Sequence, residues 1–213
     1  MILELLHAAA RGDFPPEDGA THVVGAAAGA QAAVLSFTGH HVVAADVPAE
    51  EVLAAVDPAN LNGPMAPPVL AWLADRTGLR AGSLDVVLAW VPERGDARDP
   101  AAARDLAAGR DLAVHEVSPG DHPRITRARR WRRDLRVFAG ADGLVVFGRG
   151  LADRLELSVE IEPARRNRGA ARRLVAAALA AAAPTEPVFA QVAAANAASL
   201  RALQPVGFAA VGA

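Results

Sequence analysis

The region that decides the fold lies between residues 154 and 183, where the chain reads Arg154-Leu-Glu-Leu-Ser-Val-Glu-Ile-Glu162 and then Pro163-Ala-Arg-Arg-Asn-Arg-Gly-Ala-Ala171. In the first run the odd-numbered residues are apolar, and the even-numbered ones are charged or hydroxyl-bearing. A period of two predicts a β-strand. Pro163 ends the strand, and the Ala-rich composition from Gly169 to Ala183 predicts a long helix.

Further elements are expected on both sides of this unit. Downstream, the sequence predicts a strand over 188–192, a helix over 196–203 and a short strand from Gly207. Upstream, Asp142-Gly143 predicts a hairpin turn between apolar runs at 135–139 and 144–147. Nearer the N-terminus, the patterns predict a hairpin of strands 33–38 and 41–47, helices opening at Pro48 and Pro67, and a buried strand over 83–91.

These elements predict an α/β (α+β) fold with a mixed, twisted sheet and flanking helices in residues 112–213, and a smaller N-terminal α/β lobe in residues 1–111. The charged, Ala-rich segment between Pro92 and Arg110 is interpreted as the junction, with Asp99-Pro100 opening an exposed helix.

Composition excludes several kinds of chemistry. The 213 residues include no Cys, Lys or Tyr, so disulfides, thiolate metal sites, cysteine nucleophiles and lysine Schiff bases are ruled out. No metal is expected, because the spacing of His115, Glu116 and His122 fits no helical metal motif. A net charge of −2 argues against a dedicated nucleic-acid binder.

The chain also lacks the patterns of targeting and membrane segments. Residues 1–13 have neither a basic leader nor a long apolar stretch. The most apolar run, 174–183, is shorter than the roughly 20 residues that cross a bilayer. We therefore expect no membrane association and a cytoplasmic location.

The segment after the central strand resembles the pyrophosphate loop of the GNAT superfamily of N-acetyltransferases, whose pattern is Arg or Gln, two residues, Gly, one residue, then Gly or Ala. Arg166, Gly169 and Ala171 match it. Downstream, Asn196 opens a predicted helix followed by Gly207-Phe208, which resembles the second GNAT signature. The resemblance runs from Leu135 to the C-terminus, and the Arg-rich segment after His122 is similar to actinobacterial members, here with an N-terminal extension.

Elementary physics is consistent with this resemblance. Small residues let main-chain N–H groups approach a pyrophosphate, and a helix N-terminus supplies unpaired donors and a favourable dipole. An Arg-rich turn before an Ala-rich helix also arises without any ligand in a chain of this composition, so the alternative of a merely structural loop stays open.

The resemblance implies acetyl-CoA as co-substrate and assigns its contacts by position. Main-chain groups of Val159 and Ile161 would meet the pantetheine arm, Asn196 would hydrogen-bond it, and Ser199 would face it one turn later. The residues implied around the pyrophosphate are Arg166, Asn167, Arg168, Gly169, Ala170, Ala171 and Arg172.

Catalysis needs a proton acceptor and a proton donor. Glu156 and, second, Glu160 are the candidate general bases, acting directly or through water, with a solvated strand face as the alternative interpretation. Leu203 stands where many relatives carry the tyrosine that protonates the departing thiolate. The donor would then be Ser199 or a water.

The leading hypothesis is an acetyl-CoA-dependent N-acetyltransferase in which a small-molecule or peptide amine attacks the thioester directly. A non-catalytic acyl-CoA-binding or sensor module is the alternative, motivated by Leu203. A third possibility is an interaction protein that uses the basic segment 124–136, although Ile125, Ala128 and Trp131 fall near helical spacing and predict a solvated helix with outward arginines. A homodimer is compatible with the sequence.

Overall fold

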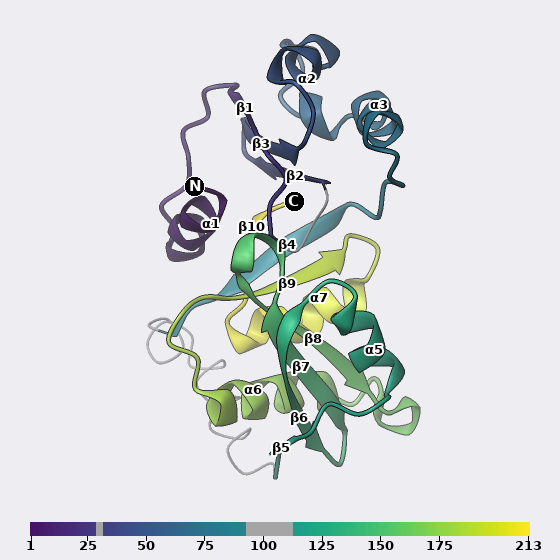
Figure 1. The fold of residues 1–213 in the computed structure, drawn as a ribbon. Coiled ribbons are helices and arrows are strands. Elements are labelled where there is room, and N and C mark those ends of the chain that lie inside the picture. Colours follow the sequence, from purple (N-terminus) through teal and green to yellow (C-terminus); the bar gives the residue numbers. More distant parts are fainter. Residues whose placement is uncertain (29–31, 93–112) are drawn as a thin grey trace.

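The computed structural model describes residues 1–28, 32–92 and 113–213. Within these ranges the chain forms a seven-stranded mixed sheet, a three-stranded sheet and six α-helices (Figure 1). This confirms the predicted α/β (α+β) class.

The larger sheet has the strand order β10-β4-β9-β8-β7-β6-β5. Its neighbours are antiparallel, except that β8 and β9 run parallel. The predicted strands and the Asp142-Gly143 hairpin are all present, and β5 is an additional edge strand. The bounds are β4 (Asp85–Trp90), β5 (His115–Val117), β6 (Arg133–Gly140), β7 (Gly143–Arg149), β8 (Leu155–Ile161), β9 (Val188–Ala193) and β10 (Ala209–Gly212).

The smaller sheet belongs to the N-terminal part and has the order β1-β3-β2. Its predicted hairpin and the two helices that open at prolines are confirmed, and the second helix ends at Gly78 in the left-handed conformation. The first helix and the first strand were not predicted. The bounds are α1 (Ile2–Arg11), β1 (Thr21–Val24), β2 (Ala32–Phe37), β3 (His40–Ala45), α2 (Ala49–Ala55) and α3 (Pro67–Thr77).

Helices cover both faces of the larger sheet (Figure 1). On one face, α6 (Ala170–Ala182) and α7 (Ala197–Leu203) enclose the main core, with Leu174 and Val175 fully buried. Burying a side chain of this size contributes about 1.5–3 kcal/mol. On the other face, α5 (Pro123–Arg129) covers β6 and β7, and α1 covers the end formed by β4, β9 and β10.

The two sheets are joined. Ser36 in β2 and Ala213 after β10 exchange two backbone hydrogen bonds, with N···O distances of 2.8 and 2.9 Å. One apolar cluster contains residues of α1, β2 and β3 together with residues of β4 and β9. The predicted boundary between residues 111 and 112 lies outside the described residues. β4 precedes it in the sequence and nevertheless lies within the larger sheet, between β10 and β9.

Two details of the basic segment differ from the sequence interpretation. α5 ends at Arg129, so Trp131 leaves the helical stripe of Ile125 and Ala128 and is 60% exposed. Arg132 does not point outward, because it turns to the carboxylate of Glu156. The predicted helix at Asp99-Pro100 lies outside the described ranges.

No helix among the described residues combines the length and apolar character that crossing a membrane requires.

Candidate functional site

The parallel strands β8 and β9 pair over a very short length. Their register joins Leu155 with Val188 and Glu156 with Phe189, and pairing stops there. β8 continues to Ile161 with β7 on its other edge throughout. The second half of β8 therefore has one edge without a strand partner, and a gap opens between β8 and β9.

The main-chain groups that face this gap follow from the register. The amide of Gly150 donates to the carbonyl of Arg154, and the amide of Glu162 donates to the carbonyl of Asp142. In an antiparallel pair, hydrogen-bonded positions alternate with non-bonded ones. Even-numbered residues of β8 thus bond to β7, and the N–H and C=O groups of Leu157, Val159 and Ile161 point away from β7, toward the gap. The carbonyl of Ile161 accepts a hydrogen bond from Nε of Arg166 there.

A cavity of about 560 Å³ lies at the gap, and we call it the strand-gap cavity. Segments distant in sequence form its walls: the start of β4, α5 with the residues after it, β8, β9 and α7. Predicted site residues Glu156, Val159, Asn196 and Ser199 all line it. The structure therefore brings together residues that lie up to 43 positions apart in the chain (156 to 199).

The loop after β8 leads into α6 with no side-chain cap. Gly169 occupies the N-cap position with φ 71°, a left-handed conformation that favours glycine. Asn167 also has a positive φ, of 60°. The first amides of α6, from Ala170 to Arg172, precede the first intrahelical bond, which Arg173 donates to Gly169 at 3.2 Å. A helix start of this kind offers N–H donors to an anion.

Two arginines hold the loop, Arg166 within it and Arg173 in α6. Arg166 folds back, donating from Nε to the carbonyl of Ile161 at 3.1 Å and from Nη2 to Glu160 at 3.0 Å. Arg173 donates to the carbonyl of Arg168 and to Asp142. Arg168 is exposed at the tip of the loop. The loop thus combines a positive charge with a main-chain conformation that side chains of the loop and of α6 hold in place.

Asn196 is the N-cap of α7, so the predicted helix begins where the sequence indicated. The side-chain oxygen of Asn196 caps the helix by accepting from the backbone amide of Ser199 at 3.1 Å. The side-chain nitrogen of Asn196 is left for other partners. Ser199 is partly buried and lines the strand-gap cavity. Leu203, at the position of the missing tyrosine, is 3% exposed and also lines the cavity.

Glu156, the first candidate base, is bound into a buried charge network. It is 4% exposed and accepts hydrogen bonds from Nε of Arg154 and from Nε of Arg132, both at 2.8 Å. Burial raises the pKa of its carboxyl, but the charges and hydrogen bonds of Arg154 and Arg132 outweigh it and hold the pKa below its usual range. This is not the solvated strand face of the alternative interpretation, and it is also a poor environment for a base.

Glu160, the second candidate, is also held by two arginines. Arg124 donates to it from Nη2 at 2.6 Å, and Arg166 donates to its other oxygen. Hydrogen bonds from Arg124, together with the charges of Arg124 and Arg166, lower the pKa of this carboxyl. The side chain of Glu160 is 31% exposed. Because Arg124 belongs to α5 and Arg166 to the loop after β8, Glu160 links these two segments.

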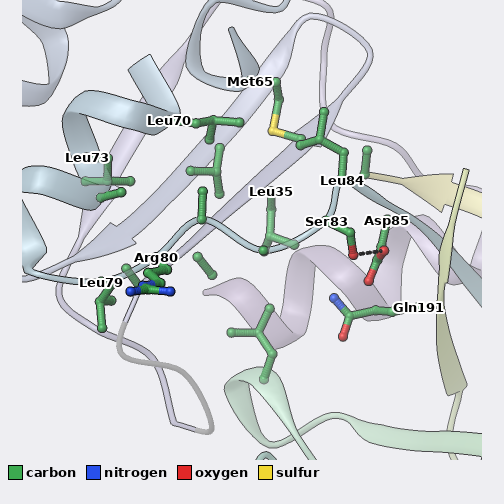
Figure 2. A pocket seen from close by; sticks show the side chains of 18 of the residues that line it. Leu35, Met65, Leu70, Leu73, Leu79, Arg80, Ser83, Leu84, Asp85 and Gln191 are labelled. Carbon is green, nitrogen blue, oxygen red and sulfur yellow. Dashed lines mark hydrogen bonds between the residues drawn. The ribbon is translucent and has the colours of Figure 1, made fainter. Parts of the chain in front are cut away.

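A third carboxylate lines the same cavity and was missed from the sequence. Asp85, at the start of β4, accepts a hydrogen bond from the hydroxyl of Ser83 at 2.8 Å (Figure 2). Among the described residues it forms no ion pair with an arginine, in contrast to both glutamates. The available signal was a Ser-x-Asp pair opening an apolar strand, but β4 was assigned to the other lobe.

Two of the other polar residues considered from the sequence, His122 and Glu116, have structural partners. His122 accepts from the amide of Arg124 and caps α5, and Glu116 pairs with Arg136. Within the basic segment, Arg124, Arg132 and Arg136 are each paired with a glutamate. Much of the basic charge between residues 124 and 136 is therefore used inside the chain.

Comparison with other proteins gives no further guide, since no protein-family model and no curated protein matches this sequence.

Proposed function

We propose that the protein binds acetyl-CoA in the gap between β8 and β9 and transfers the acetyl group to a primary amine. The observation that carries this proposal is the early end of β8–β9 pairing. It leaves the main-chain groups of Leu157 and Val159 facing a cavity. An extended amide-bearing arm such as pantetheine can pair with such an edge as an added strand does.

The start of α6 supports binding of the pyrophosphate next to that edge. The uncapped amides of Ala170, Ala171 and Arg172 begin α6 after the loop of residues 162–169, and Arg166 ties this loop to the end of β8 through the Ile161 carbonyl. A diphosphate there would gain the helix dipole and nearby arginine charge, each worth about 0.3–1 kcal/mol at an exposed site. Several such contributions are needed for useful affinity, and the loop supplies several.

The proton acceptor is best assigned to Asp85. Glu156 and Glu160 both have lowered pKa values and arginine partners, so neither takes up a proton readily. Asp85 lines the cavity with only Ser83 as a hydrogen-bond partner in the described part of the chain. It can hold an ammonium ion, accept its proton directly or through water, and release an amine for attack. Ser199 remains the candidate donor to the departing thiolate.

A thermal-shift titration with acetyl-CoA tests the binding half of the proposal. Ligand at 100 times its dissociation constant should stabilise the protein by about 2.7 kcal/mol. Gly169→Glu should abolish the shift, because it places a carboxylate at the helix start. Gly19→Glu is the matched control, since Gly19 has φ 72° and open space around it. Retained affinity in a folded Gly169→Glu variant would contradict the placement of the loop.

A non-catalytic acyl-CoA-binding module is the second candidate. The buried Leu203 favours it, because no acidic side chain stands at the position of the usual tyrosine. Measuring thiol release from acetyl-CoA against a panel of amines distinguishes the two. Binding without thiol release for any amine would select the module, and release that falls by at least tenfold in Asp85→Asn would select the enzyme.

A further inference from the structure

A second cavity adjoins the strand-gap cavity, with a volume of about 640 Å³, and we call it the apolar cavity. It lies between the three-stranded sheet, α3 and the segment leading into β4. Most of its lining is hydrocarbon, contributed by Leu35, Met65, Leu70, Leu73 and Leu79 (Figure 2). Much of this wall comes from the N-terminal part of the chain.

The two cavities share a wall with a polar character. The residues that line both are Gly82, Ser83, Asp85, Trp131, Glu156 and Gln191, and of the two carboxylates only that of Glu156 is paired with arginines within the described ranges. Figure 2 shows Ser83, Asp85 and Gln191 at one end of the apolar cavity, and Leu73 and Leu79 at the opposite end. A ligand in the apolar cavity would therefore present one end to Asp85, next to the gap between β8 and β9.

We propose that the apolar cavity binds the acceptor, and that the acceptor is a primary amine with an extended apolar body. Its ammonium group lies against Asp85, and its hydrocarbon lies toward Leu70 and Leu73. This assignment rests on the proposed function, because it names the substrate class of that site.

The transfer step balances with these groups. The ammonium loses one proton to Asp85 or to water, and its nitrogen then forms a bond to the acyl carbon while the carbon–sulfur bond breaks. The nitrogen sheds a second proton as the amide forms, and the departing thiolate takes up one proton. One proton is released to solvent for each acetyl group transferred.

Charge complementarity selects an amine over the other apolar occupant, the chain of a longer acyl group. An acyl chain would place hydrocarbon against the carboxylate of Asp85, which costs free energy because the carboxylate loses water without gaining a partner. An ammonium supplies the missing opposite charge. An apolar body then gains affinity by burial among the leucines.

Binding of n-alkylammonium ions, measured by calorimetry, tests the assignment without needing turnover. Each added methylene from propylammonium to octylammonium should tighten binding about threefold to fourfold. Octanoate should bind at least tenfold more weakly than octylammonium, and Asp85→Asn should remove that preference. Equal affinity along the series, or octanoate binding as tightly as octylammonium, would overturn the assignment.

Ala74→Phe supplies a steric test with a matched control. Ala74 is partly buried on α3 and lines the apolar cavity, whereas Ala71 on the same helix is exposed and does not line it. Ala74→Phe should abolish the preference for octylammonium and leave propylammonium binding unchanged. Ala71→Phe should leave both unchanged.

Two outcomes keep this assignment separate from the proposed function. One outcome is that octanoyl-CoA binds at least tenfold more tightly than acetyl-CoA, with this difference lost in Ala74→Phe. That result would show that the apolar cavity binds an acyl chain, and it would overturn the acceptor assignment alone. Absence of any acetyl-CoA thermal shift, with the alkylammonium series behaving as expected, would overturn the coenzyme site and leave the amine cavity supported.

Discussion

The two halves of β8 carry the same alternating sequence but are used differently. In the first half, Leu155 and Glu156 have strand partners on both sides, and the charged side chain is buried between Arg132 and Arg154. In the second half, from residue 157 to 161, one edge is open, and Glu160 lies partly exposed between two arginines. A uniform sequence pattern thus covers one part of the strand that is paired on both sides and another part that has one open edge.

The difference between the two halves of β8 is therefore one of strand pairing and not of side-chain type. Glu156 and Glu160 are the same residue type and lie on the same face of the strand, and each pairs with two arginines. Only Glu160 lies where β8 is no longer paired with β9. Substitutions in the first half should therefore change stability, and those in the second half should change affinity for acetyl-CoA.

The largest effect is expected from Glu156→Leu. Arg154 is fully buried, its two terminal nitrogens have no hydrogen-bond partner among the described residues, and Glu156 holds its Nε. Removing one partner of a buried pair typically costs about 3–5 kcal/mol. Urea unfolding should show a loss of this size, while Glu160→Leu should lose less than about 1 kcal/mol. Similar losses in both variants would remove the distinction between the halves.

Val159→Pro should weaken acetyl-CoA binding by about two- to tenfold, the value of one neutral hydrogen bond. The N–H of Val159 points to the gap and makes no bond to β7, so proline removes a donor from the site without breaking the sheet. Isothermal titration calorimetry measures the change, with Val159→Ala correcting for the side chain. Ser158→Pro should destabilise the fold instead, because that N–H belongs to the ladder with β7. The opposite pattern would show that the register assignment is wrong.

Arg166→Ala should weaken acetyl-CoA binding by about two- to fivefold. It removes one exposed charge and the hydrogen bond from Nε of Arg166 to the Ile161 carbonyl. The loss should shrink at high salt as screening increases. Arg76→Ala, which removes an arginine paired with Glu51 in the N-terminal part, is the control and should leave affinity unchanged. A loss that does not depend on salt would assign Arg166 a purely structural role.

Much of this architecture was predictable, because short local sequence patterns determine it. Three local signals each fix a short segment through backbone geometry alone. They are the alternation of residues 155–161, the prolines at the starts of α2 and α3, and the Asp142-Gly143 turn. The helix start at Gly169 and the cap at Asn196 are equally local. These signals located the loop, the gap-facing strand and α7.

The composition of the site was less predictable, because it depends on which distant segments meet. β4 lies within the larger sheet, and this placement brings Asp85 to the cavity. No residue near Asp85 in the sequence indicates that β4 lies between β10 and β9. The burial of Glu156 likewise requires Arg132 to turn inward after α5 ends, which the helical spacing of Trp131 had argued against. The apolar cavity depends in the same way on packing between the two sheets.

The smallest expected effect concerns the pH dependence that Glu160 contributes. Because Arg124 and Arg166 lower the pKa of Glu160 in the folded protein, its charged form stabilises the fold. That contribution is fully present above the value near 4.5 of an unperturbed glutamate, and it is lost as the pH falls through the lower folded value. Glu160→Gln should therefore be less stable than the parent by at most about 1 kcal/mol at pH 7, as expected for a partly exposed pair. The difference should persist down to about pH 4.5 and shrink below it, when urea unfolding is compared at pH 7, 5, 4 and 3.5. A difference that stays constant over that range would mean that the arginines hold Glu160 by geometry without favouring its charge.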